Sequence, residues 1–261
     1  MLRILKEIFE YRDLLWMLTL RDIKIRYKQT MMGFVWAIFM PIIAVCAGIV
    51  IKKAIAVVAQ RPLGIEDIIT ISIKVLPWTF FVSSIRFAVQ SLVGNSDLVS
   101  KIYFPRAVLP FSSILACFFD FSIAAFVLTV ILVILKIGVS IYLLWLPIVL
   151  LFLFTFTFGL SLLLSAANLF FRDVKYIVEI ILMFGIFFTP VFYDAEIFGN
   201  LKTLLLLNPM GSILESLNQA VVLKRMPDLI WLGYAGACSF LMFYLGMVVF
   251  YKKEQLFAEN I

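Results

Sequence analysis

Two long runs without a charged residue limit what this chain can fold into. Twenty-three uncharged residues separate Lys28 from Lys52, and another twenty-three separate Asp228 from Lys252. A helix needs roughly 20 apolar residues to cross a bilayer, so each run predicts a membrane-spanning helix. The composition agrees, because 64% of the 261 residues are hydrophobic and only 15% are charged, whereas soluble domains are about half apolar and a quarter charged. We therefore expect an all-α integral membrane protein rather than a water-soluble enzyme.

The sequence lacks most of the residues and motifs on which enzymatic catalysis depends. No histidine is present, which excludes His-based acid–base catalysis, His metal ligands and His-activated nucleophiles. The three cysteines stand alone in apolar stretches, without the spacing of a metal site or a disulfide framework. A Walker A motif and a GxGxxG motif are also missing. We predict no catalytic residue, no metal and no cofactor in this chain.

Six membrane spans are predicted, with glycine and proline breaks dividing the longer apolar stretches. The spans cover about 31–51, 72–93, 107–135, 142–167, 174–193 and 229–251. Spans two and five each contain a lysine near their start, Lys74 and Lys175 respectively. Both lysines lie close enough to the ends of their spans to extend toward the membrane surface.

Arg86 and Asp120 lie deeper, in consecutive antiparallel spans. A charged side chain at the centre of the bilayer costs about 2.5–3.5 kcal/mol on insertion scales, so it usually faces protein or water. Arg86 precedes Gly94 by eight residues and therefore lies roughly 12 Å from the cytoplasmic end of its span. We predict an Arg86–Asp120 ion pair in preference to a proton relay, because a relay needs more than isolated carboxylates.

The distribution of basic residues predicts the orientation of the chain. Thirteen of the 22 Lys and Arg residues fall in the N-terminal segment, the second and fourth loops and the C-terminus, and seven fall on the opposite side. Loops rich in Lys and Arg stay in the cytoplasm. We therefore expect the protein to lie in the cytoplasmic (inner) membrane with both termini in the cytoplasm. The first apolar run begins only after residue 30, which indicates that no cleavable signal peptide is present.

Residues 1–30 are predicted to form a cytoplasmic amphipathic helix followed by a basic segment. Between Met1 and Leu20, apolar residues alternate with charged ones at near-helical spacing, and basic residues continue to Lys28. A helix of this kind serves equally well as an anchor on the membrane surface or as a docking element for a cytoplasmic partner.

The loop 94–106 joins spans two and three. Its first residues end span two, residues 97–101 can form a short helix, and Pro105 ends that helix. A short helix between two spans can transmit movement rigidly, although a plain connecting turn explains the same residues.

The stretch 194–227 lies outside the membrane in the predicted orientation. It is too apolar to be a solvated loop, and Asn208-Pro209 divides it into short helices. Thr189-Pro190 interrupts the fifth span, as expected for a helix that enters the membrane, bends and leaves again. Residues 254–261 form a cytoplasmic tail.

Four segments resemble one known family. The run RDIKIRYKQTMMGFVWAIFMP (Arg21–Pro41) resembles the N-terminal signature of type-2 ABC exporter permeases, in particular the membrane subunits that export O-antigen, capsular polysaccharide or teichoic acid. Further segments resemble that family in the same order: LVSKIYFPRAVLP (Leu98–Pro110), NLFFRDVKYIVEIILMFGIFFTPVFY (Asn168–Tyr193) and LLLLNPM (Leu204–Met210). Together they extend over nearly the whole chain.

The resemblance implies a homodimeric channel served by two copies of a separate ABC ATPase, which would bind ATP and Mg²⁺. It implies that 94–106 contains a coupling helix seated on the ATPase, that residues 1–30 form an interface helix beside it, and that 194–227 holds gate helices. The ATPase-coupling residues carried over are Asp97, Lys101, Tyr103, Phe104, Arg106, Arg21, Arg26 and Lys28, and the gate residues are Asn208 and Pro209. The family often places an Arg shortly after its NPM helix, and residues 215–219 lack one.

The resemblance also implies a lipid-linked polysaccharide as the substrate, O-antigen above all, and no nucleic acid. Sugars present C–H faces that stack on aromatic rings, so a polysaccharide conduit favours aromatic side chains. The candidate channel-lining residues are Phe34, Trp36, Phe39, Phe184, Phe187, Phe188 and Tyr193. For any single one of them, packing against lipid is the more common role.

Two other functions stay open. The same scaffold can export a small amphiphile, although a short chain without large external domains favours the polymer. A membrane-embedded glycosyl- or acyltransferase acting on polyprenyl phosphates would need an acidic metal-binding motif or a histidine base, and the sequence contains neither a DxD motif nor a histidine.

Overall fold

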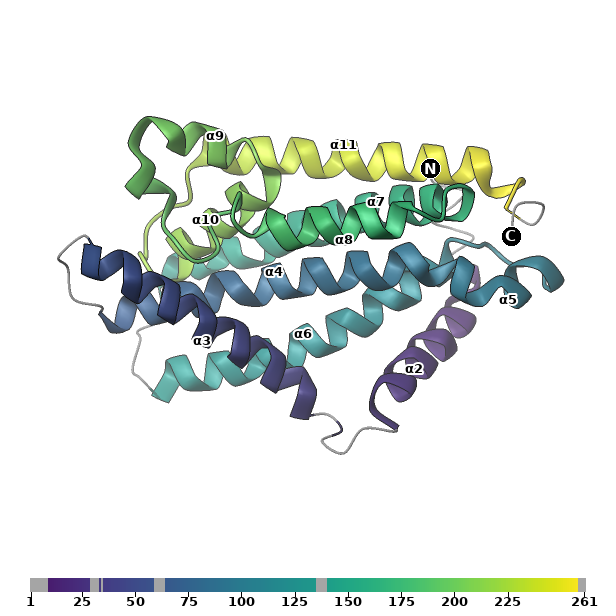
Figure 1. Cartoon of the computed structure of the whole chain (residues 1–261), viewed down its shortest axis with the longest axis horizontal. Helices are drawn as coiled ribbons and strands as arrows, with labels where there is room; N and C mark the ends of the chain where they lie inside the picture. Colours follow the sequence, from purple (N-terminus) through teal and green to yellow (C-terminus); the bar gives the residue numbers. More distant parts are fainter. Residues whose placement is uncertain (1–8, 29–32, 34, 59–63, 135–139, 258–261) are drawn as a thin grey trace.

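The computed structural model describes residues 9–28, 33, 35–58, 64–134 and 140–257, which form helices and their connections without a strand. The α-helices are α2 (Arg12–Lys28), α3 (Val35–Val58), α4 (Ile65–Ser91), α5 (Ser96–Lys101), α6 (Val108–Ile134), α7 (Leu146–Phe170), α8 (Val174–Gly185), α9 (Lys202–Leu206), α10 (Pro209–Val221) and α11 (Leu229–Glu254). Short 3-10 helices are η1 (Val93–Asn95), η2 (Ile141–Trp145) and η3 (Ala195–Leu201). In Figure 1 the long helices form an elongated bundle with α9 and α10 at one end and α5 at the other.

Five described helical segments are long and apolar enough to cross a membrane. They are Val35–Ala54, Ile65–Ser91, Val108–Ile134, Ile141–Phe170 and Leu229–Glu254, and they correspond to predicted spans one, two, three, four and six. Span two begins seven residues before its predicted start at residue 72, because Glu66 and Asp67 lie in the first turn of α4. Carboxylates are favourable at a helix N-terminus, so these charges begin the helix rather than exclude it.

The fifth predicted span does not form one continuous helix. Helix α8 has 12 residues and ends at Gly185; at 1.5 Å per residue it is roughly 18 Å long, well short of the roughly 30 Å hydrocarbon core. The prediction of a helix over 174–193 is therefore wrong for its second half. Turns follow α8, and buried Thr189 accepts a hydrogen bond from the Asn208 side chain at 2.9 Å. Such side-chain partners satisfy polar groups where the helix is interrupted.

Helix α2 differs in position from the predicted N-terminal helix. Residues 1–8 of the predicted range lie outside the described residues, and α2 extends to Lys28, through the segment predicted only to be basic. Its buried Leu18, Thr19 and Ile23 form the packed face. The Ser112 hydroxyl on α6 donates to Asp22 on α2 at 3.2 Å, so α2 is fixed to α6 rather than lying free.

The close contact between α7 and α11 depends on two glycines. A Cβ placed on Gly246 would overlap the carbonyl oxygen of Gly159, and a Cβ on Gly159 would overlap the backbone at Phe243. Small residues let helix backbones approach closely inside a membrane, where apolar side chains gain little by leaving lipid. This contact holds the last span against the fourth.

Substitution at these glycines tests the contact. Gly246→Ala should destabilise the bundle by about 1–3 kcal/mol, because the added methyl group has no space. The control is Gly233→Ala on the same helix, where a Cβ meets no atom within 4 Å. It should leave the melting temperature unchanged or raise it, since alanine favours helix over glycine by about 0.5–1 kcal/mol. Equal melting temperatures for the two purified variants in detergent would contradict this packing.

Candidate functional site

The loop at one end of the bundle presents a short helix to the surroundings. In α5, Lys101 donates to Asp97 one helical turn earlier, at 2.7 Å, and both side chains are exposed. The hydrogen bond and the charge of Lys101 hold the pKa of Asp97 below its usual value. Tyr103, just after α5, is 96% exposed. These three residues are available to a partner.

Two other predicted coupling residues point inward and hold this loop in place. Phe104 is buried. The Arg106 backbone N–H donates to the Glu254 carboxylate at 2.7 Å, and its guanidinium donates to the Glu254 carbonyl oxygen. A weaker bond at 3.4 Å reaches the carbonyl oxygen of Val99. Arg106 is half-buried and ties the loop to the end of α11.

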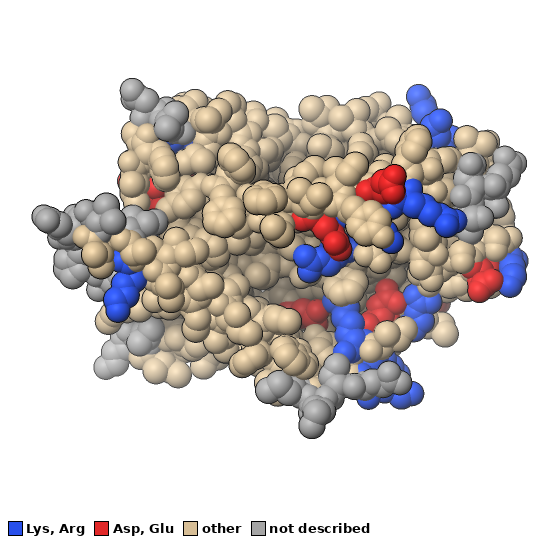
Figure 2. All heavy atoms as spheres, in the orientation of Figure 1, with Lys and Arg blue, Asp and Glu red and all other residues tan. Residues whose placement is uncertain are grey.

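The three predicted coupling residues of α2 also differ in where their side chains lie. Arg21 pairs with its neighbour Asp22 at 2.9 Å, and Lys28 is exposed. Arg26 turns into the bundle instead. Figure 2 shows that charged side chains on this face of the molecule gather mostly toward the end that carries α2 and α5 in Figure 1.

Arg26 is the partner of Asp120, and the predicted Arg86–Asp120 ion pair is wrong. The Arg26 guanidinium lies 2.8 Å from one Asp120 oxygen, and the Tyr27 hydroxyl donates to the other at 2.5 Å. Burial and the hydrogen bond to Asp120 raise the pKa of Tyr27, which keeps its proton available for that bond. Arg86, on α4, is exposed. The prediction considered only consecutive spans, whereas the actual partner comes from α2, the helix that precedes the first span.

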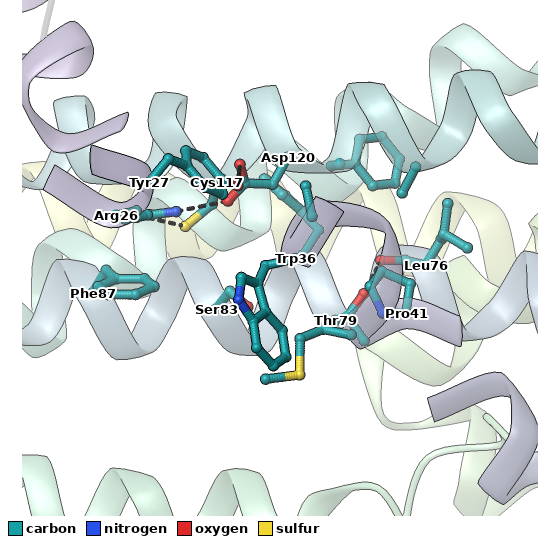
Figure 3. Close-up of a pocket in the computed structure, with 15 residues that line it drawn as sticks. Arg26, Tyr27, Trp36, Pro41, Leu76, Thr79, Ser83, Phe87, Cys117 and Asp120 are labelled. Carbon is teal, nitrogen blue, oxygen red and sulfur yellow. Dashed lines mark hydrogen bonds and ion pairs between the residues drawn. The ribbon is translucent and has the colours of Figure 1, made fainter. Parts of the chain in front are cut away.

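The Arg26 side chain joins three helices at the wall of a cavity. Its guanidinium carbon lies 3.9 Å from the centre of the Phe87 ring on α4, and its Nη2 donates to the Cys117 sulfur of α6 at 3.3 Å. A cavity of about 410 Å³ adjoins this cluster, with Trp36 and Ser83 among its lining residues. Figure 3 shows Arg26 meeting Asp120 and Cys117, with Phe87, Ser83 and Trp36 along the cavity.

The predicted channel-lining aromatic residues lie in different parts of the structure. Phe34 lies outside the described residues. Trp36 lines the cavity and packs edge-on against Phe39, with ring centres 5.6 Å apart. The three Phe residues at the end of α8 and just after it are all exposed: Phe184, Phe187 and Phe188. Tyr193 donates to the Phe187 carbonyl oxygen at 2.7 Å. The aromatics of α3 and those near α8 therefore do not line one common cavity within a single chain.

A buried charge cluster at the opposite end of the bundle was missed by the sequence reasoning. Lys74 is fully buried rather than reaching the membrane surface, so that prediction is wrong. It pairs with Glu215 at 2.9 Å and with Asp194 at 3.2 Å. Lys52 pairs with Asp194 at 3.2 Å and with Asp67 at 2.9 Å. The sequence does contain an indication of this cluster, because Lys74 and Glu215 are single charges within apolar stretches.

This outer charge cluster (Lys52, Asp67, Lys74, Asp194 and Glu215) fixes the segment after α8 to the long helices α3 and α4. Burial by itself raises the pKa of Asp194, but the charges of Lys74 and Lys52 outweigh it, so the pKa is lowered overall. A second ion pair on the same side joins Arg225 to Glu196 at 2.7 Å. The segment is thus held by charge as well as by packing.

The predicted gate residues have a local structural role. The Asn208 side chain caps α10, accepting from the Met210 N–H at 3.1 Å, and Pro209 occupies the first turn. Proline suits this position because the first N–H groups of a helix have no partner within it. Asn208 also joins α10 to the turn after α8 through Thr189.

Residues 13–222 match the ABC-2 type transporter family. Because this match covers most of the chain, the protein belongs to the ABC-2 type transporter family, and the predicted type-2 ABC permease is confirmed. The family implies a multi-pass membrane location and an ABC ATPase partner. The chain is a transporter component and not an enzyme.

The similar proteins carry a more specific name. A protein of Myxococcus xanthus named O-antigen export system permease protein RfbA is 28% identical over 269 residues, which cover 100% of both chains. A protein of the same name from Klebsiella pneumoniae is 28% identical over 249 residues, which cover 95% of this chain and 94% of that protein. A second Klebsiella pneumoniae protein of that name gives the same values.

Two consecutive lysines provide a matched test of the outer charge cluster. Lys52→Ala should lower the free energy of unfolding by about 1–3 kcal/mol, because it removes the buried amine that pairs with half-buried Asp67 and Asp194. Lys53→Ala, at an exposed position, should have little effect. The measurement is thermal unfolding of the purified variants in detergent. Equal stability of the two variants would contradict the cluster.

The same pair of variants has a predictable pH dependence. A carboxylate whose pKa is lowered on folding contributes stability above its unfolded pKa, about 3.9 for Asp, and loses it as the pH falls through the folded value. The difference between wild type and Lys52→Ala should therefore be constant near neutral pH and shrink below about pH 4.

Proposed function

We propose that this chain is the membrane subunit of an ATP-driven exporter that carries a lipid-linked polysaccharide, O-antigen, across the cytoplasmic membrane. The observation that carries this proposal is the similarity to proteins named O-antigen export permeases over the full length of both chains. Two copies of the chain form the channel, two ATPase subunits bind ATP and Mg²⁺, and both termini face the cytoplasm.

The exposed end of the bundle is the ATPase-docking surface in this proposal. Helix α5 and the almost fully exposed Tyr103 protrude there. Beside Tyr103 is a polar cavity of about 580 Å³, lined also by Glu10, Tyr11 and Tyr251. A protruding aromatic ring next to a polar cavity suits a protein partner, because tyrosine combines a large apolar face with a hydrogen-bonding tip. Arg106 supports this surface from below through Glu254.

The exposed aromatics after α8 contribute to the channel wall once two copies assemble. Phe184, Phe187 and Phe188 are each more than half exposed, and Phe39 on α3 is also partly exposed. In a dimer, these rings offer flat apolar faces to the sugar units. The outer charge cluster and the cap of α10 hold the external segment that acts as the gate at the exit.

Deletion of the gene tests the proposed function directly. The deletion strain should lose its surface polysaccharide and regain it when the chain is supplied in trans. Unchanged surface glycan together with increased sensitivity to a small amphiphile would instead assign the chain to small-molecule export.

Tyr103 tests the docking surface. Tyr103→Ala should reduce surface polysaccharide at least tenfold and weaken co-purification of the ATPase, because it removes a side chain available to the partner. The melting temperature of the purified chain should not change, since the side chain makes few internal contacts. Ile141→Ala is the control, because Ile141 is also strongly exposed but lies at the opposite end of the bundle. Full export by Tyr103→Ala would place the docking surface elsewhere.

A further inference from the structure

Arg86 is a charged residue in the last third of the apolar helix α4, five residues before its end at Ser91, and has no partner in the described part of the chain. It is exposed, and it forms no hydrogen bond or ion pair there, since Asp120 is taken by Arg26 and Tyr27. A charge in a membrane-spanning helix that faced only lipid would be costly. Arg86 therefore requires either water or an anion.

Arg86 is poorly placed to reach the membrane surface on its own. Helix α4 ends at Ser91 and continues toward α5 at the exposed end. The Cα–Cβ bonds of a helix tilt toward its N-terminus. In α4 this direction leads away from α5 and deeper into the bundle, so the guanidinium is directed away from the nearer surface.

A polar stripe on α4 connects Arg86 to the cavity. Thr79, Ser83, Arg86 and Gln90 are spaced by four, three and four residues, which places them along one side of a helix. Thr79 and Ser83 line the 410 Å³ cavity, as does Phe87, the neighbour of Arg86. The hydroxyls and the amide of this stripe supply hydrogen-bonding groups in an otherwise apolar bundle.

The local charge is positive. Arg26 packs on the Phe87 ring, one residue from Arg86, but its charge is neutralised by Asp120. Arg86 adds a second guanidinium without a second carboxylate. An arginine fork matches the oxygens of a phosphate group and binds them bidentately. The flat ring of Trp36 offers an apolar surface on the wall of the same cavity that Ser83 and Phe87 line.

We propose that Arg86 and the polar stripe of α4 form a subsite for the phosphate head group of a membrane lipid, with the adjoining cavity accepting the first part of its chain. This inference rests on the proposed function, under which the ligand is the polyprenyl diphosphate that carries the exported polymer. An anionic phospholipid presents the same phosphate chemistry, and the test separates the two sources.

The test is equilibrium binding of radiolabelled geranylgeranyl diphosphate to the purified full-length chain in phosphatidylcholine nanodiscs. Arg86→Gln should weaken binding at least tenfold, and Arg86→Lys should recover part of the affinity, because it keeps the charge without the fork. Arg172→Gln, at another exposed arginine outside the cavity, is the control and should bind like wild type. Equal elution volumes and melting temperatures of the variants establish that each is folded.

Competitors identify the ligand. Geranylgeraniol, which has the same chain without phosphate, should not compete. Competition by phosphatidylglycerol equal to that by geranylgeranyl diphosphate would assign the subsite to anionic phospholipids, and preference for the diphosphate would assign it to the polymer carrier. Wild-type affinity in Arg86→Gln, or equal binding of geranylgeraniol, would overturn the subsite. The assay needs neither ATPase nor polymer, so such a failure leaves the export role to be judged by surface polysaccharide alone.

Discussion

The cost of leaving a charge unpaired inside an apolar bundle governs the arrangement of this protein. Lys74 is completely buried, and its position is set by Glu215, which is 141 residues away in the sequence. Arg26 and Asp120 are 94 residues apart and join the interface helix α2 to the third span. Each pair brings together segments that local sequence does not connect. Ion pairs of this kind are poor sources of net stability but strong constraints on which packing is allowed.

These constraints act at different levels of the bundle. The outer charge cluster fixes the segment after α8 to α3 and α4, and the Arg106–Glu254 contacts fix the coupling loop to the end of α11. Between them, the glycine contact of α7 and α11 holds two long helices at close range. One end is attached to α3 and α4 and the other to α11, and α7 packs against both α4 and α11. Under the proposed function, movement of the loop that carries α5 reaches the outer segment through these packed helices.

The sequence predicted five of the helices that can span a membrane, because long apolar runs are a strong local signal. It overextended the fifth span, since the apolar run continues past Gly185 although the helix ends there, and polar side chains such as Thr189 and Asn208 stabilise the break. It predicted a short helix at residues 97–101, where the structure has α5 at Ser96–Lys101, but not the directions of the side chains in that loop. Ion-pair partners were the least predictable feature. The sequence analysis paired Asp120 with Arg86, and only the packing of α2 shows that its partner is Arg26.

That distinction leaves Arg86 as a charge on a membrane-spanning helix without an ion-pair partner in the described part of the chain, and under the proposed function it connects the fold to transport. An exporter of a lipid-linked polymer has to hold a phosphate group and sugar hydroxyls within a membrane, and the stripe of Ser83, Arg86 and Gln90 offers suitable groups beside a cavity. The most direct measurement is labelling of single cysteines along α4 by a membrane-impermeant maleimide in inverted vesicles, with Cys46, Cys117 and Cys238 all replaced. Cysteines at positions 83, 86 and 90 should react, whereas one at the buried Ile85 should not. Absence of labelling at position 86, or equal labelling at position 85, would contradict a water-accessible path along this helix.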